Sequence, residues 1–299
     1  MPGAGRLTGM TDIRFGVNIH SADPELGALA REIEGLGYDT IYVPDHLGAP
    51  APFPTAVAAA LATERVRVGT LVLNAGFWNP ALLAREAATA DRFTGGRLVL
   101  GVGAGHMKSE FDLAGIPFDP FERRLATLVD VIDDLDELLR SPDHAPAAIQ
   151  RPRPPLLLGG SGDGVLTIAA RRADILSLAG VWQLPGRPPG TFTLLDADRT
   201  DERLAFFREQ AGDRDVTIDL LVQSVQVTDD RRAAAERFSA ELDGTLSPEQ
   251  VLETPYVYFG TVEEIAGQLV ERQKRYGFHG ITVQHPSYGA LGRVISELR

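Results

Sequence analysis

The chain has 299 residues, which suffices for one large domain or two small ones. Its hydrophobic content of 44% is typical of a globular protein, and its net charge of −12 excludes nucleic acid and an anionic membrane surface as main partners, because both need a basic face. The chain has no cysteine, which excludes disulfides, thiol nucleophiles and thiolate metal sites.

The sequence offers no membrane or export signal. No run approaches the roughly 20 apolar residues of a membrane span, and the Gly-rich start has no apolar core of signal-peptide length. We therefore expect a cytoplasmic protein with a flexible extension at residues 1–11 and a single domain at 12–299.

The first half alternates short β-branched runs with longer amphipathic segments. Asp23-Pro24 and Asn79-Pro80 resemble helix starts, and Gly37 resembles a helix end. In chain order we expect a strand at 13–19, a helix at 24–37, a strand at 39–43, a short helix within 54–63, a strand at 66–73, a helix from Asn79-Pro80, a strand at 97–102 and a long helix at about 120–140.

The second half continues the alternation, which predicts a parallel sheet, and eight such strands predict a closed (β/α)8 (TIM) barrel. Residues 181–199 and 243–259 fall outside it and are expected to be loops, either over the barrel mouth or as surface excursions. The expected elements are strands at 155–158, 174–178, 216–222 (with an extension through Val227) and 280–284, and helices at 163–172, 200–211, 230–242 and 262–276.

In such a barrel the reactive groups lie just beyond the carboxyl ends of the strands. Four of the six histidines fall there, although loops are polar in any case and histidine favours such boundaries. The side chains at these ends are His20, Asp45, His46, Asn74, His106, Ser161, Gln223, Gln226 and His285.

Two glycine clusters lie at the same end. Residues 101–105 lack the dinucleotide-binding spacing, and they predict either a close backbone approach to a planar ligand or a plain turn. Residues 159–164 link a strand to a helix, where free N–H groups and the helix dipole bind phosphate; the alternative is an ordinary connection with Asp163 as N-cap. A zinc hydrolase is disfavoured and no metal is expected, because one histidine follows the first strand and carboxylates are few.

Several segments resemble the luciferase-like monooxygenase superfamily, from about residue 12 to the C-terminus. They are YVPDHL at 42–47, the stretch RVRVGTLVLNAG…GRLVLGVGAG at 65–105, PRPPLLLGGSGDGVLTIAARRADI at 152–175 and GTVEEIAGQL at 260–269. The segment GAGHMKSEFDLAGIPFDPFERR at 103–124 is most similar to a branch that uses the deazaflavin coenzyme F420.

The resemblance implies roles for particular residues. A non-proline cis peptide at Leu71-Val72 is expected behind the flavin ring. The pair Asp45 and His46 is expected near the ring as catalytic residues, together with His106, and His46 is placed to protonate or hydrogen-bond near the reacting carbon. The implied cofactor-binding residues are Leu71, Val72, Asn74, Gly103, Ala104 and Gly105 at the ring, and Gly159, Gly160, Ser161 and Gly162 at the ribityl phosphate.

One departure from the family changes the expected chemistry. In related sugar-phosphate dehydrogenases a glutamate donates the proton just after the fourth strand, and His106 stands there in this chain. This argues against glucose-6-phosphate as substrate and makes His106 a candidate acid that titrates near neutral pH, the alternative being a core or loop histidine.

The function expected is hydride transfer between F420 and a small organic substrate, with FMN as the alternative cofactor. The chain has 27 arginines and two lysines, which fits the GC-rich genomes where F420 is common, whereas its acidic charge is unfavourable for the glutamate tail of F420. The rivals are an FMN-dependent monooxygenase that uses oxygen and a non-catalytic cofactor-binding protein. The resemblance also implies a homodimer, and Phe77, Trp78, Trp182 and Tyr258 are either pocket or core residues.

Overall fold

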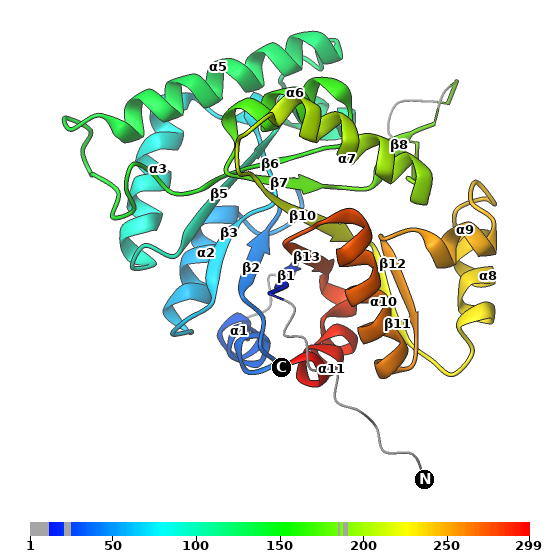
Figure 1. Cartoon of the computed structure of the whole chain (residues 1–299). Helices are drawn as coiled ribbons and strands as arrows, with labels where there is room; N and C mark the ends of the chain where they lie inside the picture. The colour runs from blue at the N-terminus through cyan, green and yellow to red at the C-terminus, as the bar shows by residue number, and fades with distance from the viewer. Residues whose placement is uncertain (1–11, 21–24, 185, 188–190) are drawn as a thin grey trace.

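A closed ring of parallel strands forms the centre of the molecule, which is known from a computed structural model that describes residues 12–20, 25–184, 186–187 and 191–299 (Figure 1). The strands follow the order β3-β2-β1-β13-β10-β7-β6-β5-β4, and an additional pairing of β3 with β5 closes the ring. The expected (β/α)8 barrel is therefore confirmed. Its strands are β1 Arg14–Asn18, β2 Thr40–Val43, β3 Arg67–Thr70, β4 Leu73–Asn74, β5 Leu98–Gly103, β6 Leu156–Gly159, β7 Ile175–Leu178, β10 Thr217–Val222 and β13 Gly280–Gln284.

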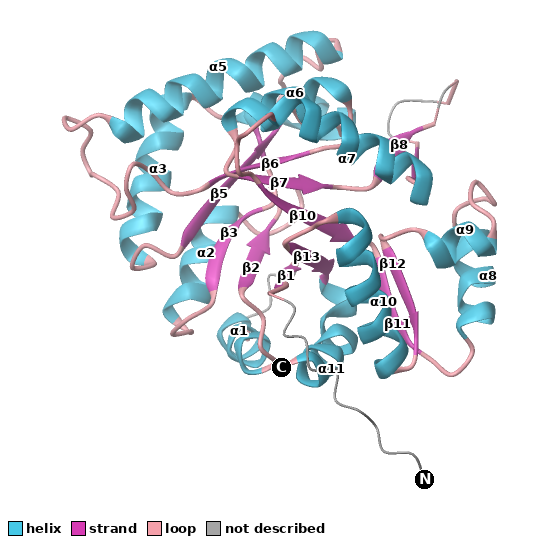
Figure 2. Cartoon of the chain, in the orientation of Figure 1, coloured by secondary structure: helices cyan, strands magenta, loops and turns pink. Residues whose placement is uncertain are grey.

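Helices surround this ring, and Figure 2 shows them on the outside of the strands. None of the helices in the described ranges has the length and apolar character needed to cross a membrane. The helices are α1 Leu26–Gly35, α2 Pro52–Leu61, α3 Pro80–Phe93, α4 Lys108–Ala114, α5 Phe121–Arg140, α6 Asp163–Arg172, α7 Ala197–Ala211, α8 Arg231–Glu241, α9 Pro248–Glu253, α10 Val262–Tyr276 and α11 Tyr288–Leu298, with short 3-10 turns η1 Ala75–Phe77 and η2 His285–Ser287.

Local capping chemistry explains why several helices begin where the sequence predicts. The side chain of Asn79 accepts hydrogen bonds from the backbone N–H groups of Ala81 and Leu82 at the start of α3. At the start of α10, Thr261 and Glu264 form a capping box. The N-cap of α6 is Gly162, so the alternative of Asp163 as N-cap is wrong.

Two layers of apolar packing hold the barrel together. Alternate strand residues face the helices, where a continuous core of buried aliphatic and aromatic side chains forms. A smaller cluster of Tyr42, Leu71, Val99 and Leu157 fills the interior of the ring. Side chains thus occupy the middle of the barrel, as in other folds of this kind, and leave its two ends for ligands.

The sequence reading is wrong about the end of the seventh strand. Residues 224–227 do not prolong β10, because the chain turns at Gln223, whose N–H donates to the carbonyl of Tyr256. They form β11 (Ser224–Val227), which pairs in parallel with β12 (Val257–Gly260) in a separate two-stranded sheet (Figure 2).

The two stretches expected as loops contain regular structure as well. Residues 181–199 hold the antiparallel pair β8 (Val181–Gln183) and β9 (Phe192–Leu194) and the start of α7, while 243–259 hold α9 and most of β12. Besides α9, two further helices, α4 and α11, lie outside the expected set. The predicted extension at 1–11 and the helix start at Asp23-Pro24 lie outside the described residues.

Candidate active site

Two histidines meet at the carboxyl end of the barrel. His46 follows β2 and His106 follows β5, and their ring centroids lie 5.9 Å apart with the planes at 88°. Phe192 of β9 packs edge-on against His106 at 5.7 Å between centroids. His46 and His106, which are 60 positions apart in the sequence, are thus neighbours at the carboxyl end of the barrel. Strand β9 lies next to them.

A buried carboxylate holds His46. Its Nδ1 lies 2.9 Å from Oε1 of Glu110 on α4, whose side chain is 11% exposed against 36% for that of His46. Because an ionised carboxylate only accepts hydrogen bonds, Nδ1 is the protonated nitrogen of His46 in this pair. The other ring nitrogen, Nε2, is then the one that can exchange a proton.

Glu110 is a residue that the sequence reading missed. It lies in the segment 103–124 that was matched to the F420 branch, four positions after His106, so an acidic residue one helical turn beyond a mouth histidine was the available signal. The seven-residue helix α4 that carries it was not distinguished from the surrounding loop.

The environment of His106 favours the neutral imidazole. Burial lowers the pKa of His106 below its ordinary value, and the nearby His46 lowers it further, against the opposing effect of Glu110. At pH 7 His106 is a neutral group that can accept or relay a proton.

Asp45 has a structural task at this end. Oδ2 of Asp45 accepts hydrogen bonds from the backbone N–H of Asn74 at 3.2 Å and from Nε1 of Trp78 at 2.9 Å. It therefore connects the end of β2 to the turn that follows β4. Trp78 also packs edge-on against Phe53 of α2, which makes this tryptophan part of the same support.

The third strand of the barrel is interrupted between β3 and β4. The peptide bond Leu71-Val72 is cis, at the position that the family resemblance indicates. The glycines opposite make room for this segment: a Cβ on Gly103 would lie 2.7 Å from Cγ2 of Val72, and a Cβ on Gly105 would lie 2.4 Å from Oδ1 of Asn74. Gly103 and Gly105 therefore leave space for the side chains of Val72 and Asn74. The expectation from the sequence was that their backbone would approach a ligand directly.

The loop between β6 and α6 carries an unpaired polar group. The hydroxyl of Ser161 is buried and has no hydrogen-bond partner among the described residues. It lies directly before the N-terminus of the ten-residue helix α6, with Gly160 at φ +155° and Gly162 as N-cap. Unpaired N–H groups, the helix dipole and this hydroxyl together suit an anion such as phosphate.

Several polar side chains lie close together at the carboxyl ends of β1 and β13. Nε2 of His20 is 3.0 Å from Oε1 of Gln284, and Oδ1 of Asn18 is buried without a partner in the described part of the chain. His285 stacks on Tyr288 at 5.3 Å, and burial lowers its pKa. Asn18 is a further mouth residue that the sequence reading did not assign to the ligand site.

Other sequence candidates lie away from the two histidines. Gln223 donates to the carbonyls of Ala179 and Leu221, and Gln226 is exposed on β11, outside the barrel. Tyr258 is fully buried in β12 beneath the guanidinium of Arg272, so it belongs to the core. Within the described ranges, no three histidine or carboxylate side chains gather as a metal site would require.

Comparison with known proteins identifies the family. Residues 10–277 match the family of luciferase-like monooxygenases. The chain belongs to this family. One luciferase-like relative, the F420-dependent glucose-6-phosphate dehydrogenase of Nakamurella multipartita, is 31% identical over 268 residues, which cover 80% of this chain and 75% of the relative. The FMNH2-dependent dimethylsulfone monooxygenase of Pseudomonas putida is 33% identical over 131 residues, which cover 39% of this chain and 36% of that protein.

Solved structures share the luciferase-like barrel at low identity. An F420-dependent secondary alcohol dehydrogenase superimposes with a TM-score of 0.73 at 19% identity, over 96% of this chain and 99% of the other. A long-chain alkane monooxygenase gives a TM-score of 0.73 at 13% identity, over 96% and 91%. These similarities establish the shared fold.

Proposed function

We propose that this chain is an oxidoreductase that transfers a hydride between coenzyme F420 and a small uncharged organic substrate. The observation that carries the proposal is the hydrogen-bonded pair His46–Glu110 with His106 at 5.9 Å, at the rim where the third strand is interrupted. The F420-dependent relative that aligns over most of its length supports the choice of cofactor.

The residues at the mouth fit such a cofactor. The buried, unpartnered hydroxyl of Ser161 at the start of α6 supports a phosphate site on the loop of Gly159, Gly160, Ser161 and Gly162. The ring would lie against Val72, which Gly103 and Gly159 seat in place. When bound, the deazaflavin supplies or accepts the hydride, and the protein contributes binding, orientation and exclusion of water.

His46 manages the proton in this proposal. Glu110 holds the Nδ1–H of His46 and balances the charge of the imidazolium, so Nε2 takes the hydroxyl proton as a substrate is oxidised and returns it in the reverse direction. His106, neutral at pH 7, faces His46 and relays the proton toward solvent. Asp45 supports the site through Asn74 and Trp78 without taking part in proton transfer.

The charges around the mouth favour an uncharged substrate. Lys108 pairs with Asp112 on the same helix. Arg124 donates to the carbonyls of Gly105 and Asp119, and its guanidinium lies 4.1 Å from the ring centre of Phe118. Since these cations already have partners, a sugar phosphate would find no free positive group among them.

A flavin monooxygenase is the second candidate, because an FMNH2-dependent relative matches part of the chain. Titration of the purified protein with F420 and with FMN separates the two. We expect F420 to bind with a Kd of about 1 μM or below and FMN at least about tenfold more weakly. Binding of FMN alone would contradict the deazaflavin proposal.

Turnover then tests the site. With F420 bound, a panel of small alcohols, aldehydes and ketones is screened through the absorbance of the cofactor. For an accepted substrate, His46→Ala should lower kcat by about 100-fold or more while cofactor binding remains. A loss of both would indicate a role in binding instead. We further propose that the protein is a cytoplasmic homodimer, the dimer on the basis of the family resemblance.

A further inference from the structure

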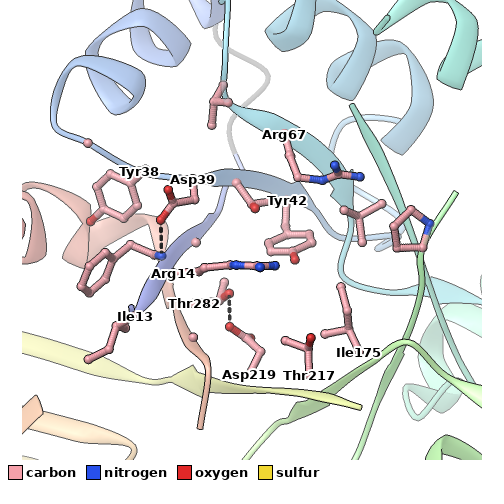
Figure 3. A pocket seen from close by; sticks show the side chains of 18 of the residues that line it. Ile13, Arg14, Tyr38, Asp39, Tyr42, Arg67, Ile175, Thr217, Asp219 and Thr282 are labelled. Carbon is pink, nitrogen blue, oxygen red and sulfur yellow. Dashed lines mark hydrogen bonds between the residues drawn. The ribbon is translucent and has the colours of Figure 1, made fainter. Parts of the chain in front are cut away.

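The amino end of the barrel contains a cavity of about 680 Å³, opposite the end that carries His46 and His106 (Figure 3). Side chains from several strands line it, among them Arg14 of β1, Tyr42 of β2, Arg67 of β3, Asp219 of β10 and Thr282 of β13. The interior of such a barrel is ordinarily filled with layers of branched apolar side chains. A polar hollow of ligand size at this end therefore calls for a physical explanation.

Arg67 is a partly buried cation that forms no direct ion pair with a described residue, although the nearby Asp91 acts to raise its pKa. Its Nη2 donates to the carbonyl of Leu98 at 3.0 Å and to Oε1 of Gln150 at 2.9 Å, and no ion pair joins it to an acidic side chain in the described part of the protein. Burial lowers the pKa of Arg67. Among the described residues, Asp91 is joined to Arg67 only through the side chain of Gln150. Because the guanidinium has no direct counter-charge among them, the site suits an anion.

Arg14 supplies a second positive group, which is exposed to solvent. Its guanidinium reaches into the middle of the cavity, between Tyr42 and Asp219 (Figure 3). Arg14 makes no side-chain hydrogen bond or ion pair within the residues that the structure describes. Arg14 on β1 and Arg67 on β3, the two strands that flank β2, thus line one cavity, and Arg14 has guanidinium N–H groups free to bind an oxyanion.

Most carboxylates around the cavity already form hydrogen bonds or ion pairs within the protein. Asp12, at the rim of the cavity, is exposed to solvent. Glu34 accepts the backbone N–H groups of residues 64–66, Asp39 pairs with Arg299, and Asp174 pairs with Arg153. Asp219 accepts the hydroxyls of Ser177 and Thr282, and burial raises its pKa to about 7, so it balances Arg14 only in part.

The remaining wall is apolar or carries hydroxyls. Val99, Ile175 and the ring of Tyr42 contribute apolar surface to the wall, and Thr40 and Thr217 contribute hydroxyls. An inorganic ion would fill only a fraction of this volume and would leave the apolar wall uncovered. The wall therefore fits an organic body attached to the anionic group.

We propose that this cavity binds a small organic anion, a carboxylate or phosphate monoester, with its oxyanion between Arg14 and Arg67 and its apolar body against Tyr42, Val99 and Ile175. The site is separate from the proposed F420 site, because it lies at the other end of the strands.

Calorimetric titration of the full chain tests the proposal, with phenyl phosphate, benzoate, inorganic phosphate and the neutral benzamide as probes. We expect one site per chain for phenyl phosphate or benzoate, and none for benzamide. Arg14→Ala and Arg67→Gln should each weaken binding by about tenfold or more. Arg85→Ala removes an exposed arginine of α3 and should change binding by less than about twofold.

Three results would overturn the proposal. No heat with either organic anion at about 10 mM would mean that the cavity is not an anion site. Inorganic phosphate that binds as tightly as phenyl phosphate would contradict the role of the apolar wall. Binding that is lost in Ser161→Ala, and kept in Arg14→Ala and Arg67→Gln, would place the anion at the phosphate loop of the opposite end.

Discussion

A single hydrogen bond defines how His46 can act, because Glu110 holds Nδ1 and directs proton exchange to Nε2. We predict that Glu110→Gln lowers kcat by on the order of tenfold and changes KM by less than about threefold, since the imidazolium loses its counter-charge while the binding surface stays. Steady-state kinetics in the His46→Ala background provide the check. There, Glu110→Gln should have no further effect on kcat; an independent, additive loss would show that Glu110 acts by another route.

Asp219 connects the stability of the barrel to pH. Burial raises its folded-state pKa to about 7, whereas an aspartate in an unfolded chain titrates near 3.9. Between these values the folded protein holds a proton that the unfolded chain has released, so the contribution of Asp219 to stability is fully present below about 3.9 and is lost as the pH rises through about 7.

The variant Asp219→Asn isolates this contribution, because the amide does not titrate. Relative to the wild type, we predict that the variant gains on the order of 2–3 kcal/mol in free energy of unfolding between pH 5 and pH 8. Urea denaturation of both proteins at the two pH values measures the difference. A constant difference across this range would mean that Asp219 is ionised throughout.

The sequence predicts individual mouth residues where their position follows from the strand order. His46 and His106 come just after recognisable strands, so the barrel alone brings them to one rim. The sequence does not predict the role of Glu110, because this residue reaches the site from α4 through a tertiary contact with His46. The roles of Asp45 and Gly103 also depend on neighbours, namely Trp78 and Val72, that no local pattern specifies.

Among the elements, those with their own start and stop signals were predicted best. The helices at 163–172 and 262–276 and the strand at 280–284 have the expected limits. The pair β11 and β12 was missed, since each is four residues long and gains its structure from pairing with a partner about 30 residues away. Short helices such as α4 and α9 carry too few turns for a periodic signal.

The loop between β6 and α6 should recognise the phosphate of the cofactor. We predict that Ser161→Ala weakens F420 binding by about three- to tenfold through loss of one hydroxyl donor, and leaves the binding of its phosphate-free deazaflavin nucleoside unchanged. Fluorescence titrations with the two ligands make the comparison. Equal weakening of both would place Ser161 against the ring instead of the phosphate.

The interrupted third strand depends on a glycine in its neighbour. In Gly103→Ala the new Cβ would lie 2.7 Å from Val72, so we predict a loss of about 1–3 kcal/mol in free energy of unfolding together with weaker cofactor binding. Gly267→Ala on α10, where a Cβ meets nothing within 4 Å, is the control and should be neutral or stabilising by up to about 1 kcal/mol. Chemical denaturation compares both variants. Equal stability of Gly103→Ala and the wild type would show that Val72 moves freely.

For the whole molecule, the barrel separates two kinds of chemistry at its two ends. The carboxyl end holds the histidine pair, the glutamate and the phosphate loop, and the amino end holds two arginines over a buried aspartate. The packed interior of Tyr42, Leu71, Val99 and Leu157 lies between them. An anion bound at one end can therefore affect the other only through this cluster and the strands.

The outer surface bears on the predicted homodimer. Leu61 and Phe93 end the neighbouring helices α2 and α3 and are 73% and 63% exposed, so we propose these two helix ends as the dimer contact. We predict that light scattering gives twice the 32.2 kDa mass of the chain, and that Leu61→Glu combined with Phe93→Glu gives the single mass with an unchanged circular dichroism spectrum. Leu113→Glu on α4, at a site 76% exposed, is the matched control and should stay dimeric.

A wild-type protein with the mass of one chain would refute the dimer. A double variant that stays dimeric would exclude these two helix ends as the interface.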